Sequence, residues 1–239
     1  MTTVNLILAI ASIALFPAII WMLIVGFKVK RIFKKYDKIG STSMITGNQM
    51  ARGVLNRAGL NDVDVAMISG RLTDHFDPKD NTVYLSEATF NSASVAALGI
   101  AAHEVGHAIQ HNEQYAPLKL RTSLVPYINI TSRFAFPLIF IGIILEALFQ
   151  LTNFSYILLY IGISFYGTYT LFTLITLPVE YNASSRAKKI LYESGILSVS
   201  ETKMAGEVLS AAAKTYLAAF VVSLLQFLRL LSLLMGRRR

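Results

Sequence analysis

Residues 4–27 read VNLILAIASIALFPAIIWMLIVGF, a run of 24 residues without a single charged side chain. A helix needs roughly 20 apolar residues to cross the hydrocarbon core of a bilayer, so this run is long enough to span one. Pro17 lies inside the run, and membrane helices tolerate proline. A cleaved signal peptide has basic residues before its apolar core, whereas here they follow it. The run therefore predicts an N-terminal transmembrane anchor over residues 1–27.

Two more apolar stretches lie downstream. Residues 134–178 contain one charged residue, Glu146, and are long enough for two helices joined by a turn near residues 150–153. Residues 216–235 contain only Arg229, so they either span the bilayer or lie at its surface with the arginine extended toward the headgroups. We therefore predict a mainly α integral membrane protein with three to four transmembrane helices.

The charge pattern orients these helices. The chain is 54% hydrophobic and 15% charged, yet its net charge is +8. Residues 28–38 hold six lysines or arginines against one aspartate, a net charge of +5, and residues 237–239 add three arginines. The basic run after the first helix predicts that residues 28–133 and 179–214 lie on the cytoplasmic side of the plasma membrane. The arginine tail fits this topology only if residues 216–235 do not fully cross.

Composition also excludes several classes of protein. The basic residues flank apolar stretches and form no recognisable reading motif, so we expect no nucleic acid as a partner. The chain has no cysteine, which excludes a disulfide-stapled scaffold and a cysteine-ligated metal site. The expected partners are a lipid bilayer and a peptide or membrane-protein substrate, with other membrane proteins or further copies of the chain as additional candidates.

The polar region between the first anchor and the hairpin predicts a small α+β structure. An amphipathic helix is expected over residues 47–59 and a second helix over residues 94–111. Residues 64–69 and 82–86 have the pattern of short strands, with a turn-rich segment between them.

The second of these helices contains His103-Glu104-Val105-Gly106-His107. Residues four apart lie on one face of a helix, about 6 Å apart along its axis, so both imidazoles can reach one metal ion. Zinc is the metal expected for this pattern, and Glu104 is placed to take a proton from the bound water as the general base. The small neighbours, Ala101, Ala102 and Gly106, suit a helix buried beside a metal.

A third zinc ligand must come from elsewhere in the chain. His111 continues the helical row but lies about 12 Å from His103 along the axis, too far for bonds of about 2 Å. The position ten residues after the first histidine is Glu113, so a third histidine is missing there. A downstream glutamate is the usual alternative, and we favour Glu180, which lies where the hairpin ends, two residues after Pro178. The carboxylates considered are Glu146, Glu180, Glu193, Glu201 and Glu207.

Several stretches together resemble one family. GRLTDHFDP, VYLSEATF, SVAALGIAAHEVGHAIQH, APLKLR and TLPVEYNASSRA are similar to the YugP-like neutral zinc metallopeptidases, over nearly the whole chain. The resemblance implies a membrane-embedded zinc protease with a zincin-like catalytic region and Glu180 as a zinc ligand. The site plan also resembles that of HtpX-type proteases, whose corresponding helix contains Glu-x-x-Ala-Asp. Glu180 and Ala183 match that pattern, whereas Ser184 replaces the aspartate, which leaves open what holds the zinc histidines.

Other residues are weaker candidates for contacts to substrate or transition state. His75 could stabilise an oxyanion, although a histidine in an aspartate-rich turn is more often structural. Val83, Tyr84 and Leu85 could form an edge strand on which an extended substrate pairs through its main chain. Arg186, with Tyr181, could reach a tetrahedral intermediate.

The predicted function is therefore a membrane-anchored zinc metalloendopeptidase that uses Zn²⁺-activated water on membrane proteins or peptides. The alternative is a zinc-binding membrane scaffold or regulator without catalysis. We expect His103, His107 and Glu180 to bind the metal. The predicted organisation is an anchor (1–27), a cytoplasmic zincin-like region (28–133), a transmembrane hairpin (134–178), a helix with the third ligand (179–214) and a C-terminal transmembrane or interfacial helix with a basic tail (215–239).

Overall fold

A computed structural model describes residues 3–237 of the chain, which form two compact units. Residues 25–119 and 177–215 form one, called here the α+β unit. Of the described residues, those before residue 25, residues 120–176 and those after residue 215 form the other, called here the membrane unit. The chain therefore passes from one unit to the other four times.

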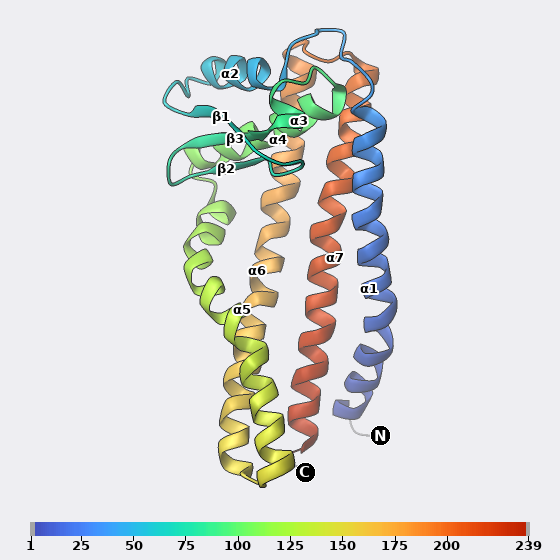
Figure 1. The fold of residues 1–239 in the computed structure, drawn as a ribbon, viewed down its shortest axis with the longest axis vertical. Coiled ribbons are helices and arrows are strands. Elements are labelled where there is room, and N and C mark those ends of the chain that lie inside the picture. The colour runs from blue at the N-terminus through green and yellow to red at the C-terminus, as the bar shows by residue number, and fades with distance from the viewer. Residues whose placement is uncertain (1–2, 238–239) are drawn as a thin grey trace. The chain divides into compact units, whose positions relative to one another are not determined.

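Four long helices contribute to the membrane unit (Figure 1): α1 (Thr3–Tyr36), α5 (Ala116–Phe149), α6 (Thr152–Glu193) and α7 (Val199–Arg237). Each is long and apolar enough to cross a membrane. This confirms a mainly α membrane protein. The predicted hairpin is present, with Gln150 in the left-handed region (φ 54°) at its turn. Its arms are longer than the apolar stretch, because α5 begins at Ala116 and α6 continues to Glu193.

The last helix packs along the hairpin inside the membrane unit. Leu234 of α7 belongs to one buried cluster with Ile139 of α5 and Leu159 of α6. Nearer the start of α7's apolar stretch, the Thr170 hydroxyl donates to the Ser223 carbonyl oxygen at 3.3 Å. These contacts extend along the apolar stretch of α7. Of the basic tail, Arg238 and Arg239 lie outside the described residues.

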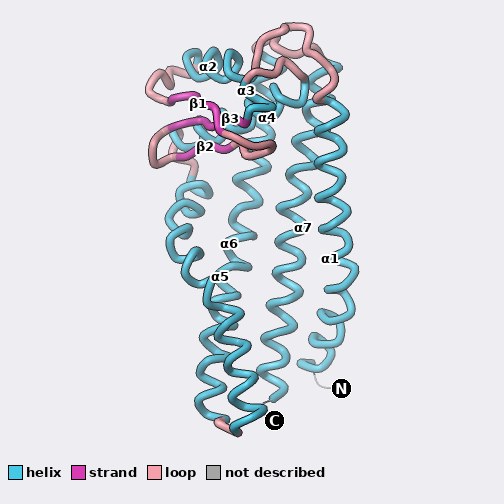
Figure 2. Tube along the Cα trace, viewed as in Figure 1, coloured by secondary structure: helices cyan, strands magenta, loops and turns pink. Residues whose placement is uncertain are grey.

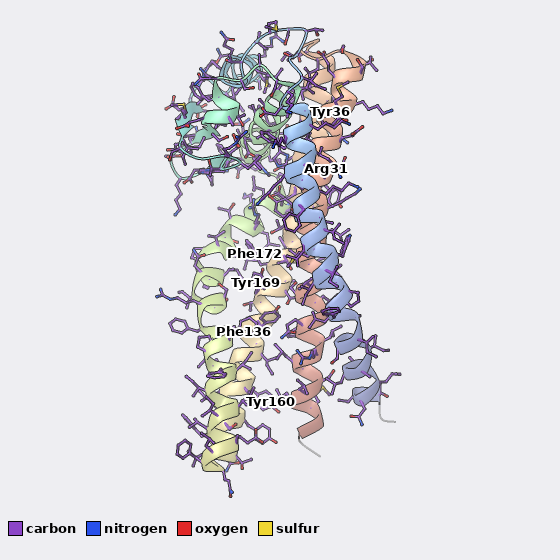
Figure 3. All side chains as sticks on the ribbon, turned by 45° about the vertical axis from the view of Figure 1, so that its right-hand side comes forward. Arg31, Tyr36, Phe136, Tyr160, Tyr169 and Phe172 are labelled. Atoms are coloured by element: carbon purple, nitrogen blue, oxygen red, sulfur yellow. The ribbon has the colours of Figure 1, made fainter. Side chains whose placement is uncertain are left out.

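The exterior of the membrane unit is apolar. Ile13 and Phe16 of α1 are 76% and 70% exposed, and Phe136 of α5 is 52% exposed (Figure 3). Such side chains are stable facing lipid, since a bilayer core is itself apolar and the helix satisfies its own backbone hydrogen bonds.

The α+β unit holds a three-stranded sheet, with β1 (Asp64–Ile68), β2 (His75–Asp77) and β3 (Thr82–Ser86) in the order β1-β3-β2 (Figure 2). β3 pairs in parallel with β1 and antiparallel with β2. The expectation that β3 is an edge strand is therefore wrong, because both its edges are occupied. The turn-rich pattern of residues 70–81 concealed β2, which has only three residues and forms an edge of the sheet.

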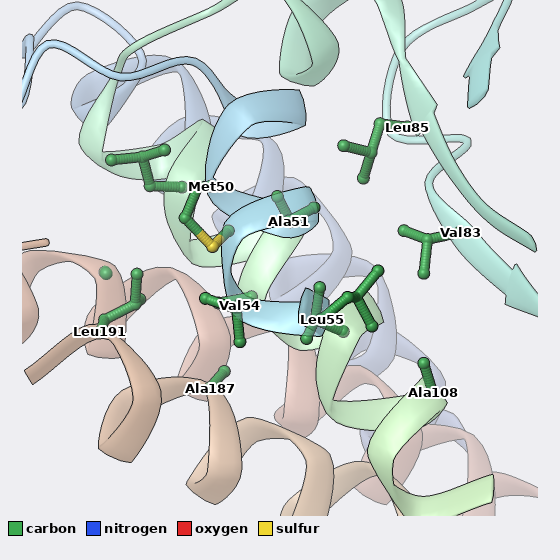
Figure 4. Packing of buried hydrophobic residues seen from close by; sticks show 14 of the residues in the cluster. Met50, Ala51, Val54, Leu55, Val83, Leu85, Ala108, Ala187 and Leu191 are labelled. Carbon is green, nitrogen blue, oxygen red and sulfur yellow. The ribbon is translucent and has the colours of Figure 1, made fainter. Parts of the chain in front are cut away.

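Three shorter helices complete this unit: α2 (Gly47–Arg57), α3 (Glu87–Phe90) and α4 (Val95–Asn112). A capping box between Thr46 and Gln49 starts α2, because each side chain bonds the other's backbone N–H. Its apolar face covers α4 and the inward side of β3, as Figure 4 shows for Leu55, Val83 and Leu85. The predicted helices at residues 47–59 and 94–111 and the predicted strands are confirmed within two residues.

Candidate metal centre

Helix α4 holds the two histidines of the HEVGH motif. Ser94 caps its N-terminus by accepting a hydrogen bond from the Ala97 N–H at 3.1 Å. From there the helix continues unbroken to Asn112, so His103 and His107 lie one turn apart on one face. Their rings meet edge to face, with centroids 4.7 Å apart.

Helix α6 lies close against α4 because Gly106 has no side chain. A Cβ atom at Gly106 would lie 2.9 Å from the carbonyl oxygen of Ala183, which is closer than real Cβ contacts allow. Ala183 is itself fully buried. The two helix backbones therefore come closest at Gly106 and Ala183. Because these two residues have little or no side chain, the nearby His107 and Glu180 come within reach of each other.

Three potential ligand atoms converge at this crossing. The Oε2 atom of Glu180 lies 3.2 Å from Nε2 of His103 and 3.6 Å from Nε2 of His107. All three ligand atoms lie within 4.8 Å of one another. Tetrahedral zinc with bonds of about 2.0–2.1 Å separates its ligand atoms by about 3.3 Å, so the donor set and its spacing fit zinc. Among residues 3–237 this is the one group of histidines and carboxylates with such spacing.

The far nitrogen of His107 meets a buried glutamine that the sequence analysis missed. Nδ1 of His107 lies 3.0 Å from Oε1 of Gln110. The amide nitrogen of Gln110 donates to the Val179 carbonyl oxygen at 2.9 Å and to Oδ1 of Asn182 at 2.8 Å. Because these two acceptors orient the amide, its oxygen faces His107 and accepts the Nδ1 proton. The lone pair of His107 then lies on Nε2, the nitrogen beside Glu180.

Ser184 occupies the corresponding position beside His103. Its Oγ atom lies 3.3 Å from Nδ1 of His103, leaving Nε2 directed at Glu180. A hydroxyl thus stands where the related pattern has an aspartate, and it can accept the Nδ1 proton without adding a charge.

Burial shapes the electrostatics of the site. Glu104 is 7% exposed, and this burial raises the pKa of its carboxyl, while the two histidines oppose the shift. Burial on its own lowers the pKa of His107, but the hydrogen bond and charge of Glu180 outweigh it and raise that pKa. The site therefore combines a buried carboxyl of raised pKa with imidazoles held against a second carboxylate.

The remaining candidate ligands have other partners. Glu201 accepts hydrogen bonds from the backbone N–H groups of Thr42 and Ser198 at 2.7 and 2.8 Å. Glu207 accepts from the Tyr36 hydroxyl. Glu193 lies 3.9 Å from Lys189. His111 stays on α4 with its ring 5.6 Å from that of Phe76.

The weaker candidates for substrate contacts lie in defined surroundings. Val83 and Leu85 are fully buried, and the Tyr84 hydroxyl donates to Asp80. His75 lies on the edge strand β2, where its ring stacks on Tyr84 and its Nδ1 is 2.8 Å from the Thr73 carbonyl oxygen. Arg186 donates two hydrogen bonds to Glu113, at 2.9 and 2.6 Å, and a third to Asn182.

Comparison with known proteins gives a consistent result. The family model described as "Putative neutral zinc metallopeptidase" matches residues 11–235. The chain is 44% identical over 212 residues to "Putative membrane protease YugP" of Bacillus subtilis (strain 168), covering 89% of this chain and 91% of that protein. No solved structure matches it. The matched segment includes the motif, its partner helix and most of all four long helices, and the chain belongs to the putative neutral zinc metallopeptidase family.

Proposed function

We propose that this protein is a membrane-anchored zinc endopeptidase, in which His103, His107 and Glu180 bind the metal and Glu104 is the general base. The observation on which this rests is the convergence of two imidazole nitrogens and one carboxylate oxygen within 4.8 Å, next to a buried glutamate. Three protein ligands leave a fourth tetrahedral position for water, as in catalytic rather than structural zinc sites.

The chain's own residues have distinct tasks in this scheme. Bound zinc would supply a water of lowered pKa and a polarised peptide carbonyl. Glu104 takes the proton from the attacking water and passes it to the leaving amine, a role that suits a carboxyl of raised pKa. Gln110 and Ser184 hold the imidazoles with Nε2 toward the metal position.

The substrate is proposed to be a membrane protein or membrane peptide, cleaved on the cytoplasmic side. The basic run at residues 28–38 supports this side, because it follows the first apolar run directly. An extended peptide would pair with an edge of the sheet, and of the three strands β2 is the edge that contacts α4. His75 is then the candidate substrate contact on that edge, while Val83 and Leu85 support the strand from inside.

The decisive experiment compares Glu104→Gln with the unchanged protein, both purified at full length in lipid nanodiscs. Metal analysis and cleavage of a general protein substrate, with and without a chelator, are measured together. We expect Glu104→Gln to keep its zinc and lose at least about a hundredfold in cleavage rate. Glu193→Gln is the matched control, since this exposed carboxylate lies outside the group.

Full cleavage by Glu104→Gln would contradict the assigned base. Zinc binding without chelator-sensitive cleavage of any substrate by the unchanged protein would instead favour a scaffold or regulator. Membrane peptides that accumulate in cells with Glu104→Gln would identify the substrates.

A further inference from the structure

A second feature of the α+β unit is a cavity of about 520 Å³ lined by residues of α1, α6 and α7. Four lysines line it: Lys28 from α1, Lys188 from α6, and Lys203 and Lys214 from α7. None of them is a zinc-site residue. Three helices thus contribute four lysines to the lining of one cavity.

The positive charge in this cavity is poorly neutralised. Among residues 3–237, no carboxylate lies within ion-pair distance of these four lysines. The one acidic residue in the lining is Glu207, which accepts a hydrogen bond of 2.5 Å from the Tyr36 hydroxyl. The Tyr36 hydroxyl in turn accepts a hydrogen bond of 2.9 Å from Lys35 (Figure 3 labels Tyr36 on α1). The cavity is therefore suited to an anion.

One face of α7 supplies much of the cavity lining. Lys203, Glu207, Ser210 and Lys214 follow one another at helical spacing, with Gly206 beside them. A Cβ atom at Gly206 would lie 3.3 Å from Cδ of Lys188. The stem of Lys188 therefore lies against the backbone of α7, and a larger side chain at position 206 would enter this space.

The position of the lysines along their helices indicates which anion. Lys28 directly follows the apolar residues 4–27, and Lys214 lies two residues before the apolar residues 216–235. Because both apolar runs belong to candidate membrane spans, we expect these two lysines near the level of the lipid phosphates. Lys188 and Lys203 are ten or more residues away from the apolar stretches, deeper on the polar side. Basic pockets between helices at the cytoplasmic boundary bind anionic lipid headgroups.

We propose that this cavity binds the headgroup of an anionic phospholipid. Its phosphate would lie between Lys28 and Lys214, and the polar remainder of the headgroup would extend toward Lys188 and Lys203. This inference is independent of the proposed protease activity.

The test measures retention of phosphatidylglycerol by the full-length protein in a zwitterionic detergent, using native mass spectrometry and thermal unfolding. The cavity variant is Lys28→Gln with Lys214→Gln. Its control is Lys34→Gln with Lys38→Gln, which removes equal charge from the basic run that contains Lys28 but outside the cavity. We expect about thirtyfold weaker lipid binding for the cavity variant and little change for the control.

A third variant, Gly206→Leu, fills the cavity without changing its charge, and it should also lose the lipid. Zinc content and helical circular dichroism establish that each variant is folded. Equal losses in the cavity variant and the control would overturn the proposal in favour of diffuse attraction. So would full binding by Gly206→Leu. If inorganic phosphate alone displaces the lipid and stabilises the protein equally, the ligand is a free phosphate and the lipid assignment is wrong.

Discussion

In each of the two units, a glycine allows two helices to pack closely, but the side chains around the two crossings differ. In the α+β unit, Gly106 lets α4 approach the backbone of α6, with 2.9 Å between a Cβ there and the Ala183 oxygen. In the membrane unit, Gly162 lets α6 approach α5: a Cβ atom at Gly162 would likewise lie 2.9 Å from the carbonyl oxygen of Ala135. Small residues at helix crossings are favoured in membranes because they permit close van der Waals packing.

The outcome differs because of the side chains beside each crossing. Next to Gly106 lie His107 and, across the interface, Glu180, so close approach brings titratable groups together. Next to Gly162 lie Ile139 and Ile163, and nearby hydroxyls such as that of Ser155 donate to backbone carbonyl oxygens. The comparison teaches that a close crossing supplies proximity, and the neighbouring residues decide whether proximity becomes chemistry.

The largest expected effect is on zinc binding, and it comes from removing the Glu180 carboxylate at the crossing of α4 and α6. Glu180→Ala should weaken zinc binding by more than about a hundredfold, because it deletes one of three proposed ligands. Metal content after dialysis at fixed free zinc measures this. Glu193→Ala, on the same helix, should bind like the unchanged protein. Unchanged affinity in Glu180→Ala would mean that this carboxylate is no ligand.

The next effect separates the two crossings. Gly106→Ala should cost about 1–3 kcal/mol through overpacking against the Ala183 backbone, and it should also reduce zinc content. Gly162→Ala should destabilise the hairpin by a similar amount with zinc content retained. Thermal unfolding and metal analysis test both. Gly53→Ala, in open space on α2, should stabilise by up to about 1 kcal/mol. Zinc loss in Gly162→Ala would break the distinction.

A smaller effect is expected from the residues that orient the imidazoles. Gln110→Leu should weaken zinc binding about ten- to a hundredfold, since it removes the acceptor for the His107 Nδ1 proton. Ser184→Ala should weaken zinc binding less, because the contact of Ser184 with His103 is longer, at 3.3 Å, than the 3.0 Å contact of Gln110 with His107. Competition with a chromogenic chelator gives both affinities. If Ser184→Ala lost as much zinc affinity as Gln110→Leu, or more, the roles given to these two residues would be contradicted.

The smallest effect concerns the ion pair of Glu113 and Arg186. The hydrogen bonds from Arg186 lower the pKa of Glu113, so the pair stabilises the fold above the unfolded-state pKa of about 4.3. That contribution is lost as the pH falls through the lowered folded-state pKa. The Glu113 side chain is half-exposed, so solvent screens the pair. Glu113→Gln should therefore lower the free energy of unfolding by only a few tenths of a kcal/mol near neutral pH, and not at all at pH 2. Unfolding measured across pH tests this; a constant difference would argue against an ion-pair effect.

Sequence reasoning reached the features that depend on local spacing. The apolar lengths predicted the long helices, and the four-residue spacing placed both histidines on one face. Grouping Glu180 with them needed more, because 77 residues and a hairpin separate it from His103. The place of Glu180 at the end of the predicted hairpin favoured it, and the resemblance to a family supported the choice.

Features that depend on tertiary contacts were missed. The central place of β3 depends on β2, whose three residues give no alternating pattern. The role of Gln110 depends on Asn182 and the Val179 carbonyl across the helix crossing. Its one sequence signal was its position three residues after His107, on the same helical face.

The order of the elements along the chain has a consequence for biosynthesis. His103 and His107 emerge from the ribosome before residues 134–178, and Glu180 emerges after them. A nascent chain that has not yet delivered its hairpin therefore lacks one of the three proposed ligands. Completion of the proposed metal site must therefore follow translation of the hairpin, so the unfinished chain holds at most two of the proposed ligands while it is being made.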